Sequence, residues 1–231
     1  MLAAAVISLV AAAAPQVPPA ARAGVTASAP APPHPLPSGG RAGPRGAPPP
    51  LVDAAARIPD ALLDVRYATS HNFTGRPLYP VARCLLLPGT AARLERAAAR
   101  LRRQGLRVVL HDCYRPRSVQ RALWAAMPKV GYVADPATGS HHNRGAAVDL
   151  SLADPAGRPV ALPTGYDAFG PKARAGATEG IPPAARRHRR LLRAAMEAEG
   201  FRVNPAEWWH YDAPEAAGAP LLDVPLTGPA R

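Results

Sequence analysis

A histidine and an aspartate in this sequence have the chemistry and the spacing of metal ligands. His142 ends a polar segment, and Asp149 lies seven residues later, inside the apolar stretch 146–152. Imidazole nitrogen and carboxylate oxygen both bind zinc well, and a carboxylate on an apolar strand needs a cationic partner. Taken alone, such a pattern is more often a loop histidine and an aspartate that faces solvent from a half-buried strand.

A second cluster, at residues 207–210, reads Glu-Trp-Trp-His and adds a third candidate ligand, His210, and a candidate base, Glu207. Three protein ligands with one open position are typical of catalytic rather than structural zinc, and a nearby carboxylate can take a proton from water. Residues three apart on a flat strand point to opposite faces, so the chain must bend at the tryptophans if both side chains face one ion. The alternative, an aromatic core strand, explains the tryptophans but not the acid and the histidine that flank them.

A third motif places Arg115 between a tyrosine and a proline, shortly after an expected strand over 106–110. A guanidinium at a strand end is suited to stabilising the oxyanion of a tetrahedral intermediate. The alternative is an ordinary surface ion pair with Asp112 or another carboxylate.

Together these motifs resemble those of the D-alanyl-D-alanine dipeptidases, the zinc peptidases known from vancomycin resistance. The family pattern Ser-x-His-x-x-Gly-x-Ala-x-Asp is met at 140–149, Glu-Trp-Trp-His at 207–210 and Tyr-Arg-Pro at 114–116. Further matches are Tyr-Ala-Thr at 67–69, Asn-Phe-Thr-Gly at 72–75 and Gly-Tyr-Val at 131–133. The resemblance covers roughly residues 64–211, most of the expected folded domain.

The resemblance implies one zinc ion per chain, with His142, Asp149 and His210 as its ligands. It implies that Glu207 is the general base and that Arg115 stabilises the transition state. The reaction would be hydrolysis of the dipeptide D-alanyl-D-alanine to two D-alanines.

On the substrate side, the loop at 164–169 is similar to a family loop whose aspartate holds the ammonium group of the dipeptide. Asp167 is the residue expected in that role, with Ser140 nearby as a second substrate-binding residue. The chain departs from the family pattern at 162–164 and at 172–174, which affects the expected shape of the substrate pocket. His141 is an alternative metal ligand, but His142 fits the family spacing.

Other functions compete with this interpretation. One is a D-alanyl-D-alanine carboxypeptidase that trims peptidoglycan stem peptides; another is a non-catalytic, zinc-stabilised module that binds cell-wall peptides. Glu207 argues against the second, because a binding module needs no base. A net charge of +12 raises the possibility of a nucleic-acid partner, but the basic residues are dispersed and no nucleic-acid motif accompanies them. We therefore expect a small dipeptide as the partner, with no nucleic acid and no stable membrane insertion.

The first fifty residues differ from the rest, since they lack Asp and Glu and hold 12 of the 30 prolines. The apolar run at 2–14 is too short to span a bilayer, and with the small residues after it resembles a secretory signal peptide within 1–23, although no basic residue precedes it. A disordered linker is expected at 24–50, the catalytic domain at 51–215 and a tail at 216–231. Export to the periplasm or medium follows if the run is a signal, and a cytoplasmic location if it is not.

The pattern of the expected domain predicts an α+β fold: a single domain with a small, mostly antiparallel sheet flanked by helices. Helices are expected over 91–104, 118–126 and 184–199, and strands over 106–110, 146–152, 201–203 and 208–211. Loops are expected at 128–139 and from the end of the second strand to Gly180. Cys84 and Cys113 could form one disulfide or remain two buried thiols.

Overall fold

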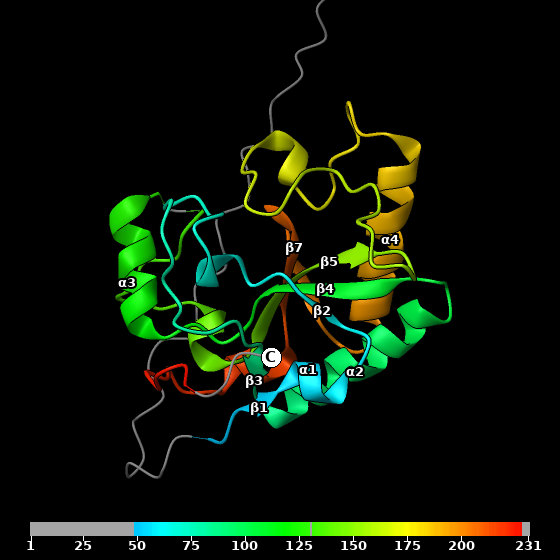
Figure 1. Cartoon of the computed structure of the whole chain (residues 1–231). Coiled ribbons are helices and arrows are strands. Elements are labelled where there is room, and N and C mark those ends of the chain that lie inside the picture. The colour runs from blue at the N-terminus through cyan, green and yellow to red at the C-terminus, as the bar shows by residue number, and fades with distance from the viewer. Residues whose placement is uncertain (1–48, 130, 228–231) are drawn as a thin grey trace, which may run out of the picture. The chain divides into compact units, whose positions relative to one another are not determined.

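A five-stranded sheet with the order β2-β4-β5-β7-β6 forms the centre of the fold (Figure 1). Strand β2 runs parallel to β4, and the other neighbours are antiparallel. The predicted α+β class with a mostly antiparallel sheet is therefore confirmed. The strands are β2 Leu62–Leu63, β4 Arg107–Asp112, β5 Ala147–Ala153, β6 Arg202–Asn204 and β7 Glu207–Asp212.

A second, two-stranded antiparallel sheet joins the beginning of the domain to a later segment, and short helices surround both sheets. The second sheet consists of β1 Val52–Asp53 and β3 Leu85–Leu86. The α-helices are α1 Ala54–Arg57, α2 Pro88–Arg102, α3 Arg117–Ala126 and α4 Pro183–Glu197. The 3-10 helices are η1 Arg66–Ala68, η2 His141–Arg144, η3 Pro171–Ala173 and η4 Pro214–Ala217.

This computed structural model describes residues 49–129 and 131–227. The predicted signal peptide, and the predicted linker up to residue 48, lie outside the described residues. No helix in the described ranges is both long enough and apolar enough to cross a membrane.

The long helices form where the sequence places buried small and aliphatic residues on one helical face. In α2 the buried positions follow the three- and four-residue spacing of such a face: Ala91, Leu94, Ala97, Ala98 and Leu101. The helix begins three residues earlier than predicted, because Pro88 is accommodated in a first helical turn. It ends before Gly105, whose φ of 70° is favourable for glycine.

The two larger of three hydrophobic clusters hold most of these elements together. The larger lies between the sheet and the helix pair α2 and α4, and it includes both tryptophans of β7. The smaller contains Val119 and Leu123 of α3, Tyr114, and Leu222 and Leu226 beyond η4. Helices α3 and α4 therefore lie at opposite ends of the domain (Figure 1).

An irregularity in β4 aligns polar residues across three neighbouring strands. Leu110 pairs with Leu150, but the next pair on β4 is Asp112 with Asp149, so His111 is an extra residue on that strand. Asp149 pairs on its other side with His210 of β7. The three polar residues Asp112, Asp149 and His210 consequently form one row across β4, β5 and β7.

A disulfide joins Cys84, just before β3, to Cys113, just after β4, with the two Cα atoms 5.0 Å apart. Of the two alternatives for these cysteines, the structure has the disulfide. The bond ties the segment that precedes α2 to the end of β4, close to the row of polar residues.

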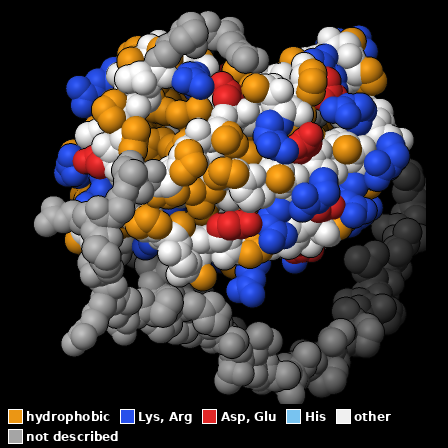
Figure 2. All heavy atoms as spheres, turned by 90° about the horizontal axis from the view of Figure 1, so that it is seen from below, with side chains coloured by type: hydrophobic (Ala, Val, Ile, Leu, Met, Phe, Trp, Pro, Cys, Tyr) orange, Lys and Arg blue, Asp and Glu red, His pale blue; other side chains and the backbone are white. Residues whose placement is uncertain are grey.

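The basic residues are mixed with acidic ones on the surface. Figure 2 shows Lys and Arg side chains interspersed with Asp and Glu on the face that carries α1 and α2. Several arginines there are ion-paired, among them Arg96 and Arg100, which both contact Glu199. The distribution matches the dispersed pattern of the sequence.

Candidate active site

Three atoms that can donate a lone pair to a metal converge on the sheet, two on buried side chains and one on the partly buried His210. Asp149 Oδ1 lies 3.3 Å from His142 Nε2 and 3.0 Å from His210 Nδ1. The two histidine nitrogens are 3.1 Å apart. Ligand atoms at roughly 2.0–2.1 Å from a tetrahedral zinc ion lie about 3.3–3.4 Å from one another. The three side chains proposed from the sequence therefore come together at a spacing that matches such an ion within a few tenths of an ångström.

The hydrogen bonds around these donors leave their lone pairs directed at each other. His142 Nδ1 lies 2.7 Å from the carbonyl of Cys113, which can only accept, so Nδ1 carries the proton and Nε2 is free. His210 Nε2 lies 2.9 Å from Asp212 Oδ1, which likewise leaves Nδ1 free. Asp149 Oδ1 is buried and accepts no hydrogen bond from any described residue. His142 Nε2, His210 Nδ1 and Asp149 Oδ1 therefore direct lone pairs at one point, and a cation there would satisfy all three.

The electrostatics of the cluster also favour positive charge. Burial alone would raise the pKa of Asp149, but His142 and His210 beside it hold that pKa well below its ordinary value. Burial opposes protonation of His210, yet Asp212 and Asp149 raise the pKa of that histidine. The negative field that favours a proton on His210 equally favours a metal cation between the three side chains.

Glu207 lies at the edge of this cluster, with its Oε2 4.0 Å from His210 Nδ1. The pairing of β6 with β7 shifts between Val203 and Asn204, and Glu207 and His210 lie near each other, as the bend expected at the tryptophans requires. Asn204 Nδ2 donates to Glu207 Oε2 at 3.0 Å. Burial raises the pKa of Glu207 to about 7; His210 opposes the rise, and Asp149 adds to it. A carboxyl group with that pKa can exchange protons at neutral pH.

Arg115 is buried beneath the same region and is held by two side chains. Its Nε and Nη2 donate to Asp112 Oδ2 at 2.9 and 2.6 Å, and Nη1 donates to Gln120 at 2.8 Å. The ion pair with Asp112 considered from the sequence thus exists, but it is buried rather than at the surface. The guanidinium lies 5.4 Å from the centre of the Tyr67 ring, and its charge lowers the pKa of both Glu207 and Asp167.

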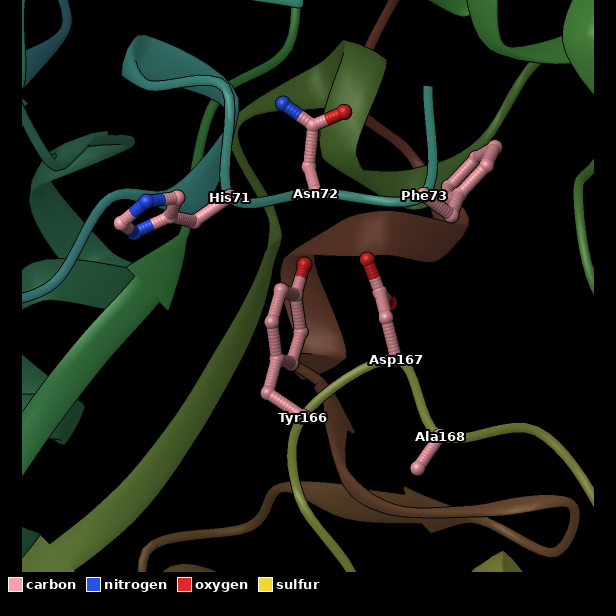
Figure 3. Close-up of a pocket in the computed structure, with 6 residues that line it drawn as sticks. All are labelled: His71, Asn72, Phe73, Tyr166, Asp167 and Ala168. Carbon is pink, nitrogen blue, oxygen red and sulfur yellow. The ribbon is translucent and has the colours of Figure 1, made fainter. Parts of the chain in front are cut away.

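A pocket of about 320 Å³ opens beside these groups, lined by His71, Asn72, Phe73, Tyr166, Asp167 and Ala168. Figure 3 shows the side chains of Tyr166 and Asp167 pointing together toward the segment of Asn72 and Phe73. Tyr166 donates to Asp149 Oδ2 at 3.1 Å. The pocket therefore adjoins the three-donor cluster, which consists of His142, Asp149 and His210. The volume is at the lower end of the range for small-molecule sites.

Asp167 occupies an unusual conformation in this pocket. Its φ of 57° lies in the left-handed region, which aspartate tolerates better than most residues. The Tyr67 hydroxyl donates to its Oδ2 at 2.9 Å. Burial of the carboxyl group raises its pKa to about 8, the charge of Asp149 adds to this, and the hydrogen bond from Tyr67 opposes it. A cationic ligand would offset the cost of ionising Asp167 there.

Comparison with known proteins decides the family. The family model described as D-ala-D-ala dipeptidase, of the peptidases, matches residues 49–226. The chain belongs to this family. It is accordingly a peptidase, of a family of metallopeptidases, and the resemblance found in its motifs is confirmed.

Three relatives of this family member are each named D-alanyl-D-alanine dipeptidase. The protein of Escherichia coli K12 is 40% identical over 172 residues, which cover 74% of this chain and 89% of the relative. That of Streptomyces coelicolor is 35% identical over 176 residues, which cover 66% of this chain and 85% of the relative. That of Enterococcus faecalis V583 is 33% identical over 172 residues, which cover 64% of this chain and 83% of the relative.

In this member of the dipeptidase family, Ser140 stabilises the turn that carries His142. Its hydroxyl accepts from the backbone N–H of His142 at 3.3 Å, and its own N–H donates to Asn143 Oδ1 at 2.7 Å. Ser140 and Asn143 also form a reciprocal capping box, which begins η2 and fixes the turn carrying His142. A substrate contact by Ser140 stays a prediction.

The other histidines among the described residues lie away from the three donor atoms. His141 Nδ1 contacts Asp212, and His111 is buried with its Nε2 2.8 Å from Ser151 Oγ. His188 Nδ1 lies 2.9 Å from the carbonyl of Ala161, and His71 is exposed at the pocket.

Several side chains of the site were not assigned a role from the sequence. Tyr67, Tyr166, Asn204 and Asp212 each contact one of the proposed functional residues. Tyr67 and Tyr166 lie in segments that resemble the family, so a signal for them existed. Asn204 and Asp212 become visible only when the strand register is known.

Proposed function

We propose that this protein hydrolyses D-alanyl-D-alanine to two D-alanines, using one zinc ion held by His142, Asp149 and His210. The observation that carries the proposal is the convergence of three lone-pair atoms beside Glu207. One of them is a buried carboxylate oxygen that accepts no hydrogen bond from the described part of the chain. The names of the relatives support the choice of substrate.

Zinc at these three ligands would supply a Lewis acid that polarises the scissile carbonyl and makes water more acidic. Glu207 then takes the proton of the attacking water and delivers it to the nitrogen of the departing D-alanine. Burial raises the pKa of this carboxyl group, which favours uptake of the proton from water. Asn204 holds the carboxylate in place through Oε2.

Arg115 supplies positive charge for the oxyanion that develops on the scissile carbonyl. Asp112 and Gln120 hold the guanidinium rigidly, so little reorganisation is needed as the oxyanion forms. Asp167, held by Tyr67, binds the ammonium group of the free dipeptide in the pocket beside the cluster. Binding the amino end in this way limits hydrolysis to substrates with a free amine one residue from the scissile bond.

The test uses purified full-length protein, zinc analysis and three substrates: free D-alanyl-D-alanine, its N-acetyl derivative and a stem pentapeptide ending in D-alanyl-D-alanine. We expect about one zinc per chain, as a mononuclear site requires, and hydrolysis of the free dipeptide that is lost with a chelator and restored by zinc. Fast hydrolysis of the pentapeptide would replace the proposal with a carboxypeptidase. Zinc binding without hydrolysis of any of the three would favour a binding module.

A further inference from the structure

One carboxylate oxygen contacts two histidines next to the three-donor cluster. Asp212 Oδ1 lies 2.9 Å from His210 Nε2 and 2.8 Å from His141 Nδ1. Asp212 ends β7 and pairs with Ala147 at the beginning of β5, while His141 begins η2. The two elements that carry His142 and His210 are therefore also joined through Asp212.

The contact with His210 decides which of its nitrogens is free. A carboxylate accepts from an N–H, so Asp212 favours the tautomer with the proton on Nε2 and leaves the lone pair of Nδ1 toward Asp149 and His142. It also fixes the rotation of the imidazole ring. Without Asp212, the ring of His210 could present either nitrogen and would lose the acceptor that orients it.

The imidazole ring of His142 is oriented by a backbone group instead. Its Nδ1 donates to the backbone carbonyl of Cys113, which no side-chain substitution removes. Asp112 Oδ2 lies 3.8 Å from the same nitrogen of His142, beyond hydrogen-bond distance, whereas the hydrogen bond that orients His210 is made to a side chain that mutation can delete.

His141 contacts the same oxygen of Asp212 from the other side. Both side chains are 28% exposed, so Asp212 without this partner would be free to turn toward water. The capping box of Ser140 and Asn143 fixes the turn that carries His141. The neighbouring histidines of this turn thus differ in position: one faces the cluster and the other faces the carboxylate behind it.

We propose that Asp212 and His141 are positioning residues for the metal site: Asp212 orients His210, and His141 acts through Asp212 by holding its carboxylate. The inference rests on the proposed metal site, but not on the identity of the substrate. Removing partners of this kind typically lowers metal affinity by about 10–100-fold.

The experiment measures zinc affinity by competition with a chromophoric chelator for the wild type, D212A, D212N, H141A and the double variant D212A/H141A. We expect D212A to bind zinc about 10–100-fold more weakly. D212N should lose less, because an amide oxygen still accepts from His210 Nε2. H141A should be weaker than the wild type, and the double variant should be no weaker than D212A, because His141 acts only through Asp212.

A spectroscopic readout separates orientation from general damage. The visible absorption bands of the cobalt(II)-substituted protein should change in D212A, because they report the geometry of the ligands. The matched control is D154A, which removes a carboxylate of similar exposure that contacts Arg158 instead. D154A should keep the affinity and the spectrum of the wild type. Thermal melting of the metal-free proteins checks folding, and D212N and H141A provide the test if D212A does not fold.

Three results would overturn parts of this account. If the wild type binds zinc and D212A binds it equally well with an unchanged cobalt spectrum, Asp212 does not position His210. If the losses in D212A and H141A add in the double variant, His141 does not act through Asp212. If the wild type binds no zinc, the proposed metal site itself fails, and this inference fails with it.

Discussion

Replacing Asp167 by Asn tests the proposed binding of the substrate ammonium in a way that depends on pH. The change keeps the shape of the side chain and removes its charge. Only the ionised carboxylate attracts the ammonium, and burial raises the pKa of Asp167 to about 8. At pH 7 about a tenth of the molecules carry the charge, at pH 8 about half and at pH 9 about nine-tenths.

The size of the effect follows from these fractions. A hydrogen bond to a charged partner contributes about 1.5–3 kcal/mol, which corresponds to roughly 10–150-fold in kcat/KM when Asp167 is fully ionised. We expect a loss of that size for D167N at pH 9, and one about tenfold smaller at pH 7, because most of the wild type is then protonated. A divalent cation at the three-donor cluster would lower the pKa of Asp167. The loss of kcat/KM in D167N would then increase at a lower pH.

The assay measures kcat/KM of wild type and D167N on free D-alanyl-D-alanine from pH 5 to pH 9, with N-acetyl-D-alanyl-D-alanine as the uncharged comparison. Taking the ratio of the two enzymes cancels most of the titration of the substrate amine, which is common to both. For the wild type the acetylated dipeptide should react at least about a hundredfold more slowly, since it leaves Asp167 unpaired. A ratio of wild type to D167N that stays near one over the whole range, or equal rates on the two substrates, would refute the role of Asp167.

Three further predictions concern the base, the disulfide and the N-terminus. E207Q should keep its zinc and lose turnover by at least about a hundredfold, the low end for general-base catalysis; near-normal turnover in a zinc-loaded variant would contradict the role of Glu207. The double variant C84S/C113S should be less stable by about 3–4 kcal/mol in denaturant unfolding, from the 29-residue separation that the bond closes, and a reducing agent should destabilise the wild type but not the variant. We also propose that the protein is exported, since disulfides persist in oxidising compartments; mass spectrometry of the native protein should then find an N-terminus beyond Ala14, and an intact Met1 in the cytoplasm would exclude export.

The sequence was sufficient to predict the elements that have strong local signals. The helices observed as α2, α3 and α4 were expected within a few residues, because buried positions repeat at helical spacing and Gly105 and Gly200 follow α2 and α4. Strands β4, β5, β6 and β7 were expected for the same kind of reason. Strands β1, β2 and β3 were not, because two residues are too few to show an alternating pattern.

Some parts of the candidate site could also be predicted from the sequence, and others could not. Ligand types and motif order were enough to nominate the three donor side chains and Glu207, and the structure brings all four together. The contacts of Asp212 with two histidines depend on the register of β7 against β5 and on the path of η2, which no local pattern encodes. The row through Asp112 exists because His111 is an extra residue in β4, a shift that the alternation of the strand does not reveal.

The row of Asp112, Asp149 and His210 on adjoining strands links the integrity of the site to the integrity of the whole domain. β5 lies between two partners in the sheet, and backbone amides in such positions exchange with solvent only when a protein opens globally. Asp149 on β5 and His210 on β7 both lie on strands with two neighbours, so we expect the backbone amides around them to be among the slowest to exchange. Substitutions that weaken the core at a distance are accordingly expected to reduce the amount of active enzyme in a cell, while each molecule that remains folded turns over substrate at an unchanged rate.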